Sequence, residues 1–137
     1  MMMQFKKILA YLWASPTTLV GVALAMPLLL TGAKIRCVQG AFEIYDGWLL
    51  RCLTQAGGFA AMTLGHIVIG VSADCLHTLR CHEHVHVRQA ERWGILFIPA
   101  YVLAGCWQSL CGRHAYYDNP FEREAFAADE EMQSHDG

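Results

Sequence analysis

A long stretch without charge near the amino terminus is the feature that most restricts how this chain can fold. Residues 8–31 contain no Asp, Glu, Lys or Arg. A helix of this length reaches about 36 Å, which is enough to cross a hydrocarbon core of about 30 Å. Pro16 and Pro27 interrupt the stretch, but membrane helices tolerate proline better than soluble helices do. We therefore expect residues 1–33 to be an N-terminal membrane anchor that contacts lipid through residues 8–31.

A cleaved signal peptide is the competing interpretation of the same stretch. Lys6 and Lys7 precede the apolar run, as basic residues do in a secretory signal. The run is long, however, and no small-x-small cleavage pattern follows it, so we favour an uncleaved, single-pass anchor. Basic residues on its far side, Lys34, Arg36 and Arg51, balance the two lysines. The positive-inside rule therefore leaves the sidedness open.

The composition narrows the class of protein. The chain has 137 residues, 55% hydrophobic and 16% charged, with a mean hydropathy of +0.28. One domain is the expectation for this length. The net charge is −2 and the basic residues are scattered, so no nucleic-acid interface is expected. The 6 cysteines form no C-x-x-C pair, which favours small buried side chains over a zinc ribbon, while disulfides and the oligomeric state stay open.

After the anchor, the pattern changes to short strands. Residues 34–38 and 41–45 alternate polar and apolar side chains on either side of Gly40, which predicts a hairpin closed by a glycine turn. Residues 48–53 fit a short helix or a strand. Residues 62–69 are rich in β-branched side chains and predict a third strand.

Three helices are expected to follow these strands. Ser72 or Asp74 can cap a helix that ends at Gly94. The apolar residues 95–107 are too few to span a bilayer, so they predict a buried or interfacial helix. Another helix begins at Pro120, since proline suits the first helical position. The fold class is therefore α+β, with an N-terminal transmembrane helix and a small antiparallel sheet.

The first of these helices carries the run His82-Glu83-His84-Val85-His86, which reads H-E-x-x-H. Residues four apart lie on one face of an α-helix, so His82 and His86 can each present a ring nitrogen to one tetrahedral Zn²⁺. Glu83 then lies beside them as the base for a metal-activated water. The alternative is a His-rich polar helix face that holds no metal.

A catalytic zinc with two histidines still lacks a protein ligand. Glu122 is our candidate, at the start of the C-terminal helix, and Glu124 is the expected hydrogen-bonding partner of a ligand; the two roles can be exchanged. An acidic helix start that only serves the helix dipole is the alternative. Because His82 and His86 precede residues 95–107 and Glu122 follows them, a shared zinc requires this apolar stretch to return to the same side of the membrane.

Several runs of this chain resemble a group of short, uncharacterised bacterial membrane-anchored proteins with an H-E-x-x-H helix. The runs are TLGH at 63–66, HEHVHVRQ at 82–89, ERWG at 91–94, IPAY at 98–101 and DNPFEREA at 118–125. The resemblance covers about residues 34–129. It implies a location in a bacterial-type cytoplasmic membrane and implies no particular substrate.

More distantly, H-E-x-x-H followed by E-x-E-A is similar to the gluzincin zinc metallopeptidases. This similarity implies a minimal zincin-like domain, residues 34–126, in which the motif helix packs with the apolar and C-terminal helices. It implies His82, His86 and Glu122 as zinc ligands and Glu83 as the base. Residues 127–137 are expected to be an acidic flexible tail.

One position departs from the gluzincin pattern. Those peptidases often follow E-x-E-A with an Asp that orients a histidine ligand, and this chain has Phe126 there. Asp129 is placed one turn too late to be a simple substitute.

The leading hypothesis is a membrane-anchored zinc hydrolase that cleaves peptide bonds in a peptide or protein substrate. An edge strand beside the motif helix would hold an extended substrate, and His66 could line that cleft. Candidates for stabilising the oxyanion are Arg88, Arg113, Tyr116 and Tyr117. The alternatives are a non-catalytic metal-binding or structural membrane protein and, less strongly, haem ligation by the histidines.

Overall fold

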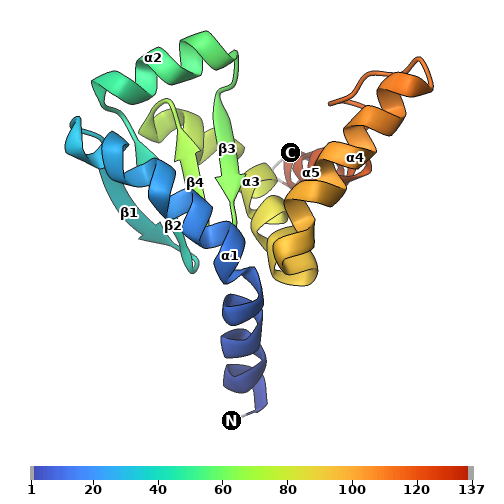
Figure 1. Ribbon diagram of the computed structural model, residues 1–137, viewed down its shortest axis with the longest axis horizontal. Helices are drawn as coiled ribbons and strands as arrows, with labels where there is room; N and C mark the ends of the chain where they lie inside the picture. The colour runs from blue at the N-terminus through green and yellow to red at the C-terminus, as the bar shows by residue number, and fades with distance from the viewer. Residues whose placement is uncertain (1, 136–137) are drawn as a thin grey trace.

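The computed structural model describes residues 2–135 and shows an α+β architecture around a small mixed sheet (Figure 1). The strands lie in the order β1-β2-β4-β3. They are β1 (Lys34–Val38), β2 (Ala41–Tyr45), β3 (Ala61–Leu64) and β4 (Ile67–Gly70). The helices are α1 (Met2–Leu30), α2 (Trp48–Gly57), α3 (Ala73–Trp93), the short 3-10 helix η1 (Gly94–Leu96), α4 (Phe97–Leu110) and α5 (Pro120–His135).

The predicted hairpin of β1 and β2 is confirmed. The strands pair antiparallel with Val38 opposite Ala41. Gln39 and Gly40 between them have φ of 50° and 87°. Two successive positive φ values give a turn whose twist matches that of the flanking strands. The sheet as a whole is mixed and not antiparallel, because the chain returns through α2 and β3 and lays β4 parallel to β2.

The predicted single strand at residues 62–69 is wrong. Two antiparallel strands, β3 and β4, occupy this stretch. The chain turns at Gly65, whose φ is 63°. A Cβ added at Gly65 would lie 2.3 Å from the Thr18 hydroxyl oxygen, so the turn also requires glycine for its contact with α1. A single glycine among β-branched residues is a weak signal for a turn, because strand propensity dominates such a pattern.

The sheet separates two apolar layers. Ile67 and Ile69 of β4 face α1 and α2, where they pack with Ile44 and Leu50. Val68, between them, faces the opposite side and packs in the cluster that α3 contributes to. This alternation follows from the two-residue period of a strand. Figure 1 shows α1 in front of the sheet and α3 behind it.

Helix α1 is joined to the domain by one stripe of mostly small residues. The buried stripe consists of Ala14, Thr17, Gly21, Ala25 and Leu28, at helical spacing. The Thr17 hydroxyl donates to the Gly94 carbonyl at 3.2 Å, which ties α1 to the end of α3. The opposite face of α1 is apolar and exposed. The predicted anchor helix is thus also a core helix over its second half.

Two segments, Met3–Leu30 and Ala73–Leu110, are long and apolar enough to cross a membrane by length and composition. The second segment is not one straight helix. Its α3 half is capped by the Ser72 hydroxyl, which accepts from the Cys75 amide, and ends at Gly94, as predicted. Gly94 has a φ of 57°, and α4 then leads away from the sheet (Figure 1).

The C-terminal helix begins at Pro120, as predicted, and continues through the stretch expected to be a tail. Asn119 caps it by accepting from the Phe121 amide at 3.1 Å. The side-chain amide of Asn119 donates to the Tyr101 carbonyl at 3.1 Å and so fixes α5 against α4. Residues 127–135 are helical, and the remainder of the expected tail, residues 136–137, lies outside the described residues.

Candidate metal centre

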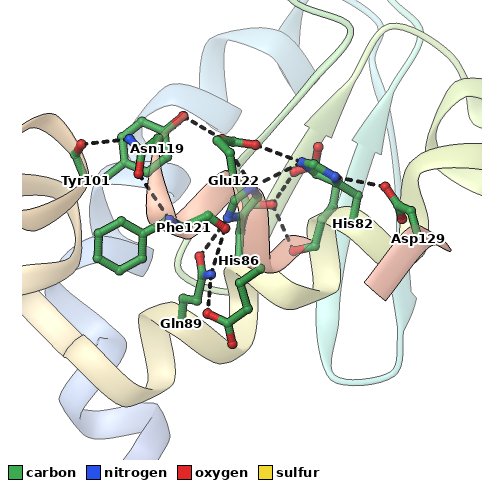
Figure 2. A network of polar contacts seen from close by, with 11 residues as sticks. His82, His86, Gln89, Tyr101, Asn119, Phe121, Glu122 and Asp129 are labelled. Carbon is green, nitrogen blue, oxygen red and sulfur yellow. Dashed lines mark hydrogen bonds and ion pairs between the residues drawn. The ribbon is translucent and has the colours of Figure 1, made fainter. Parts of the chain in front are cut away.

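Three side chains from α3 and α5 converge at one point between the two helices. His82 and His86 lie one turn apart on α3, and Glu122 lies in the first turn of α5 (Figure 2). The two imidazole Nε2 atoms are 3.3 Å apart. The Glu122 carboxylate lies 3.0 Å from Nε2 of His82 and 3.4 Å from Nε2 of His86. All three side chains are buried.

These separations suit a small tetrahedral cation. Zinc binds imidazole nitrogen and carboxylate oxygen at about 2.0–2.2 Å, so two of its ligands in a tetrahedron lie about 3.3 Å apart. The three ligand atoms lie within 4.8 Å of one another. Within residues 2–135, no fourth His, Cys, Asp or Glu belongs to this group. The described group therefore consists of two histidines and one glutamate.

A hydrogen bond from outside the group fixes the orientation of His86. Its Nδ1 lies 2.8 Å from Oε1 of Gln89, a side chain that is fully buried. The amide nitrogen of Gln89 donates to the Phe121 carbonyl at 3.0 Å and to the Glu124 carboxylate at 2.8 Å. Because both of these partners only accept, the other end of the amide must be its oxygen, and His86 must carry its proton on Nδ1. In the neutral imidazole, Nε2 then presents a lone pair.

Asp129 orients the ring of His82. Its carboxylate lies 3.0 Å from Nδ1 of His82, on the side away from Glu122 (Figure 2). The prediction that Asp129 falls one turn too late is wrong. Seven residues separate it from Glu122, which is about two helical turns, so both carboxylates lie on the same face of α5. Phe126, between them, packs edge-on against the His82 ring.

The donor set requires a positive charge between its members. With both Nδ1 atoms protonated, two nitrogen lone pairs and a carboxylate face one another, and only a bound cation or an added proton relieves their repulsion. Burial lowers the pKa of His82 and His86, but their hydrogen bonds and the nearby carboxylate charges, Glu122 foremost, together outweigh this effect, and both pKa values lie above the usual histidine value. The residues present therefore fit a divalent metal that prefers nitrogen and carboxylate ligands.

Glu122 is held ionised although it is buried. Burial raises the pKa of its carboxyl, but hydrogen bonds from His82, His86 and Tyr101 outweigh burial and hold the pKa far below the usual range. The Tyr101 hydroxyl donates to Oε1 of Glu122 at 2.5 Å from the first turns of α4. The apolar helix thus contributes directly to the site, on the same side of the protein as the histidines.

Glu83 lies beside the group without joining it. Its Oε2 accepts from the Thr63 hydroxyl of β3 at 2.6 Å. Burial raises the pKa of this carboxyl, and the hydrogen bond from Thr63 only partly opposes the rise. A carboxylate with a raised pKa can accept a proton near neutral pH more readily than an exposed one can.

An apolar cavity of about 320 Å³ opens at the group, within the size range of ligand pockets. Strand β3, at the edge of the sheet, forms one wall with residues 61–64. Phe97, Ile98 and Tyr101 from α4 line another part of it. Tyr116 also lines the cavity, and burial together with the Glu122 charge raises its pKa, so its phenol remains a hydrogen-bond donor at neutral pH.

The other predicted site residues lie elsewhere. Arg88 lines a groove on a different face of α3, and Tyr117 and Arg113 do not line the cavity. His66 is buried between α1 and α3 and lies 3.0 Å from the Glu91 carboxylate, outside the cavity. Glu124 is not a member of the ligand group and contacts His86 only through Gln89.

Three contributors were not singled out from the sequence: Gln89, Tyr101 and Thr63. Gln89 follows His86 by three residues, a helical spacing that marks neighbours on one face and was available as a signal. Tyr101 and Thr63 come from other elements, and no spacing along the chain indicates their positions. Comparison of the chain with models of protein families, with curated proteins and with solved structures finds no match.

Proposed function

We propose that this protein is a membrane-associated, zinc-dependent hydrolase that cleaves peptide bonds. The observation that carries the proposal is the convergence of two imidazole Nε2 atoms and one carboxylate, each side chain held by a further hydrogen bond, at the mouth of an apolar cavity. His82, His86 and Glu122 would hold the ion. Zinc would supply Lewis acidity and lower the pKa of a bound water to about 7.

The side chains around the ion have separate tasks. Glu83, with its raised pKa, would take a proton from the attacking water and deliver it to the leaving amine. Thr63 holds the carboxylate of Glu83 in place from β3. Tyr116 would donate a hydrogen bond to the oxyanion that develops on the substrate.

The walls of the cavity favour an extended, apolar peptide. Strand β3 is an edge strand, so its outer backbone groups can pair with a substrate strand. Such pairing would lay the peptide along residues 61–64 and across the ion. The aromatic residues of α4 would then receive a hydrophobic side chain next to the scissile bond.

The outer faces of α1 and α4 support attachment to a membrane. Exposed apolar side chains on α4 and η1 are Ile95, Leu96, Val102, Leu103, Trp107 and Leu110. Those on the second half of α1 are Leu19, Val20, Val22, Leu24, Met26 and Leu30. Because α1 also packs on the sheet, we propose that it anchors the domain directly against the bilayer, with α4 as an interfacial helix.

The proposal is tested with purified full-length protein in a mild detergent. Metal content is measured by mass spectrometry, and hydrolysis is measured with a library of peptides rich in apolar residues. We expect one zinc per chain and cleavage in the wild type, one zinc without cleavage in Glu83→Gln, and neither in His86→Ala. Cleavage that is unchanged in Glu83→Gln would overturn the hydrolytic role. One zinc in a wild type that cleaves nothing would leave a non-catalytic metal protein as the function.

A further inference from the structure

His84 is the histidine of the H-E-x-x-H run that the metal centre does not use. His84 is two residues from His82 and two from His86. It therefore lies about 200° around the helix from His82 and faces away from the metal centre. The side chain is 9% exposed, and its Nε2 is the one buried side-chain nitrogen or oxygen in residues 2–135 that has no hydrogen-bond partner. Buried polar atoms almost always have partners, so the surroundings of His84 call for an explanation.

His84 lines a groove of about 590 Å³ between α1 and α3. Lys6 and Lys7 line it from the first turns of α1, and Arg88 lines it from the turn of α3 that follows His84. The β1–β2 turn completes the lining, and the Tyr11 hydroxyl fixes α1 to this turn by donating to the Gly40 carbonyl at 2.9 Å.

The groove carries a net positive charge. None of Lys6, Lys7 and Arg88 forms an ion pair with another described residue, whereas Lys34, Arg36, Arg80 and Arg92 all do. One carboxylate, Glu91, also lines the groove and lies 3.0 Å from Nε2 of His66, so the three cations still exceed the negative charge of the lining. Cations on two separate elements that face one another across a groove repel unless an anion lies between them.

We propose that this groove binds a phosphate group. Phosphate offers several acceptor oxygens, which a guanidinium, two ammonium groups and an imidazole N–H can share. It would offset the net positive charge of the lining and, with a turn of the imidazole toward the groove, supply the hydrogen-bond partner that His84 lacks.

A phospholipid headgroup and a free phosphate are the two sources of this chemistry. Ile8, Leu9 and Leu12 are exposed on α1 next to the two lysines. If this face of α1 enters a bilayer, the lysines lie at the level of the headgroups, where each basic residue contributes about 1 kcal/mol to binding of anionic lipid.

The test uses full-length protein in neutral detergent micelles and two ligands, inorganic phosphate and short-chain phosphatidylglycerol, with short-chain phosphatidylcholine for comparison. Binding is measured by titration calorimetry for the wild type, Lys6→Gln/Lys7→Gln, Arg88→Gln and His84→Gln. Arg51→Gln, on α2 and outside the groove, is the control for charge. We expect each lost cation to weaken binding about fivefold and the control to bind like the wild type.

Binding of both ligands identifies a phosphate site, and binding of phosphatidylglycerol alone identifies a lipid site; both support the proposal. The proposal is overturned if neither ligand binds, or if Arg51→Gln weakens binding as much as Arg88→Gln does. The inference does not depend on the proposed hydrolase function, because the groove and the metal centre lie on different faces of α3. Zinc content of the same variants, expected to be unchanged, reports on the two proposals separately.

Discussion

The carboxylate of Asp129 accepts a hydrogen bond from Nδ1 of His82 at 3.0 Å. Asp129 lies on α5, the helix that also places Glu122 at the other nitrogen of the same ring. One helix thus holds His82 from both sides. This arrangement fixes the plane of the imidazole before any ion binds, and such outer hydrogen bonds raise the basicity of a ligand.

Loss of this hydrogen bond is expected to weaken metal binding without removing a ligand. We predict that Asp129→Ala lowers zinc affinity by about 10- to 100-fold, as changes in outer partners of zinc ligands commonly do. Affinity is measured by competition with a chromophoric chelator. Glu130→Ala, the exposed neighbour on α5, is the control and is expected to bind like the wild type. Equal affinity in Asp129→Ala would show that the hydrogen bond does not orient the ligand.

A buried carboxylate on the α3 side of the sheet predicts that the stability of the folded protein falls at acid pH. Glu43 is 1% exposed and accepts from Arg36 at 2.6 Å and from Arg80 at 2.8 Å. Burial raises the pKa of Glu43, but the hydrogen bonds from Arg80 and Arg36 outweigh burial and lower the pKa overall. A lowered pKa in the folded state means stabilisation that is complete above the unfolded value of about 4.3 and is lost as the pH falls through the folded value.

We therefore predict that Glu43→Gln lowers the free energy of unfolding by about 1–3 kcal/mol at pH 7. The difference from the wild type should shrink as the pH falls below about 4, since the carboxylate is then protonated first in the unfolded chain and, at lower pH, also in the folded protein. Urea unfolding at several pH values measures this difference in the free energy of unfolding, and Glu131→Gln, at an exposed position, is the control. A difference that stays constant with pH would exclude the ion pairs as its cause.

The contact of α1 with the β3–β4 hairpin predicts strong sensitivity to side-chain size at Gly21. A Cβ added there would lie 2.8 Å from both the Ile67 Cβ and the Leu64 carbonyl oxygen. We expect Gly21→Leu to destabilise the protein by at least about 1–3 kcal/mol through overpacking. Ala23→Leu, on the exposed face of α1, adds similar volume and is expected to change little. Thermal unfolding in detergent compares them, and equal melting temperatures would mean that α1 is not docked through this stripe.

Membrane contact of α4 is testable through a native cysteine. Cys106 is exposed and shares a helical face with Val102, Leu103 and Leu110. A variant with Cys106 as its sole cysteine is placed in lipid vesicles that are permeabilised, so that reagents reach both faces of the membrane. We expect Cys106 to react with a lipid-soluble maleimide and to be protected from a charged one. A variant with Cys52 alone, exposed on α2, is expected to react with both. Ready labelling of Cys106 by the charged reagent would exclude burial of this face in lipid.

Local signals in the sequence were sufficient to predict most of the helices and strands. The cap at Ser72, the breaks at Gly94 and Gly40 and the proline start at Pro120 all act on residues close in the chain, so their effects are readable there. The parallel pairing of β2 with β4 is not local. It depends on a helix and a hairpin between the strands, and residues 62–69 give only one glycine to reveal that hairpin.

The same distinction holds for the candidate site. His82 and His86 share a helix face by spacing alone, and Glu122 was predicted from its place at a later helix start. Asp129 was rejected because the spacing of known peptidases was applied to it, although a spacing of two turns serves the same histidine equally well. Partners such as Thr63 depend on how β3 packs against α3, which only tertiary structure determines.

Because one stripe of α1 packs against the domain, the two faces of this helix tolerate different substitutions. On the outward face, one apolar side chain can replace another without altering a contact within the protein. On the inward face, Gly21 admits no larger residue and Thr17 makes a hydrogen bond, so substitution there changes the domain itself. A generic hydrophobic segment grafted in place of α1 would therefore deliver the chain to a bilayer but leave the sheet without its covering layer. The face of α1 that we propose to contact the bilayer and the face that completes the fold thus belong to the same helix.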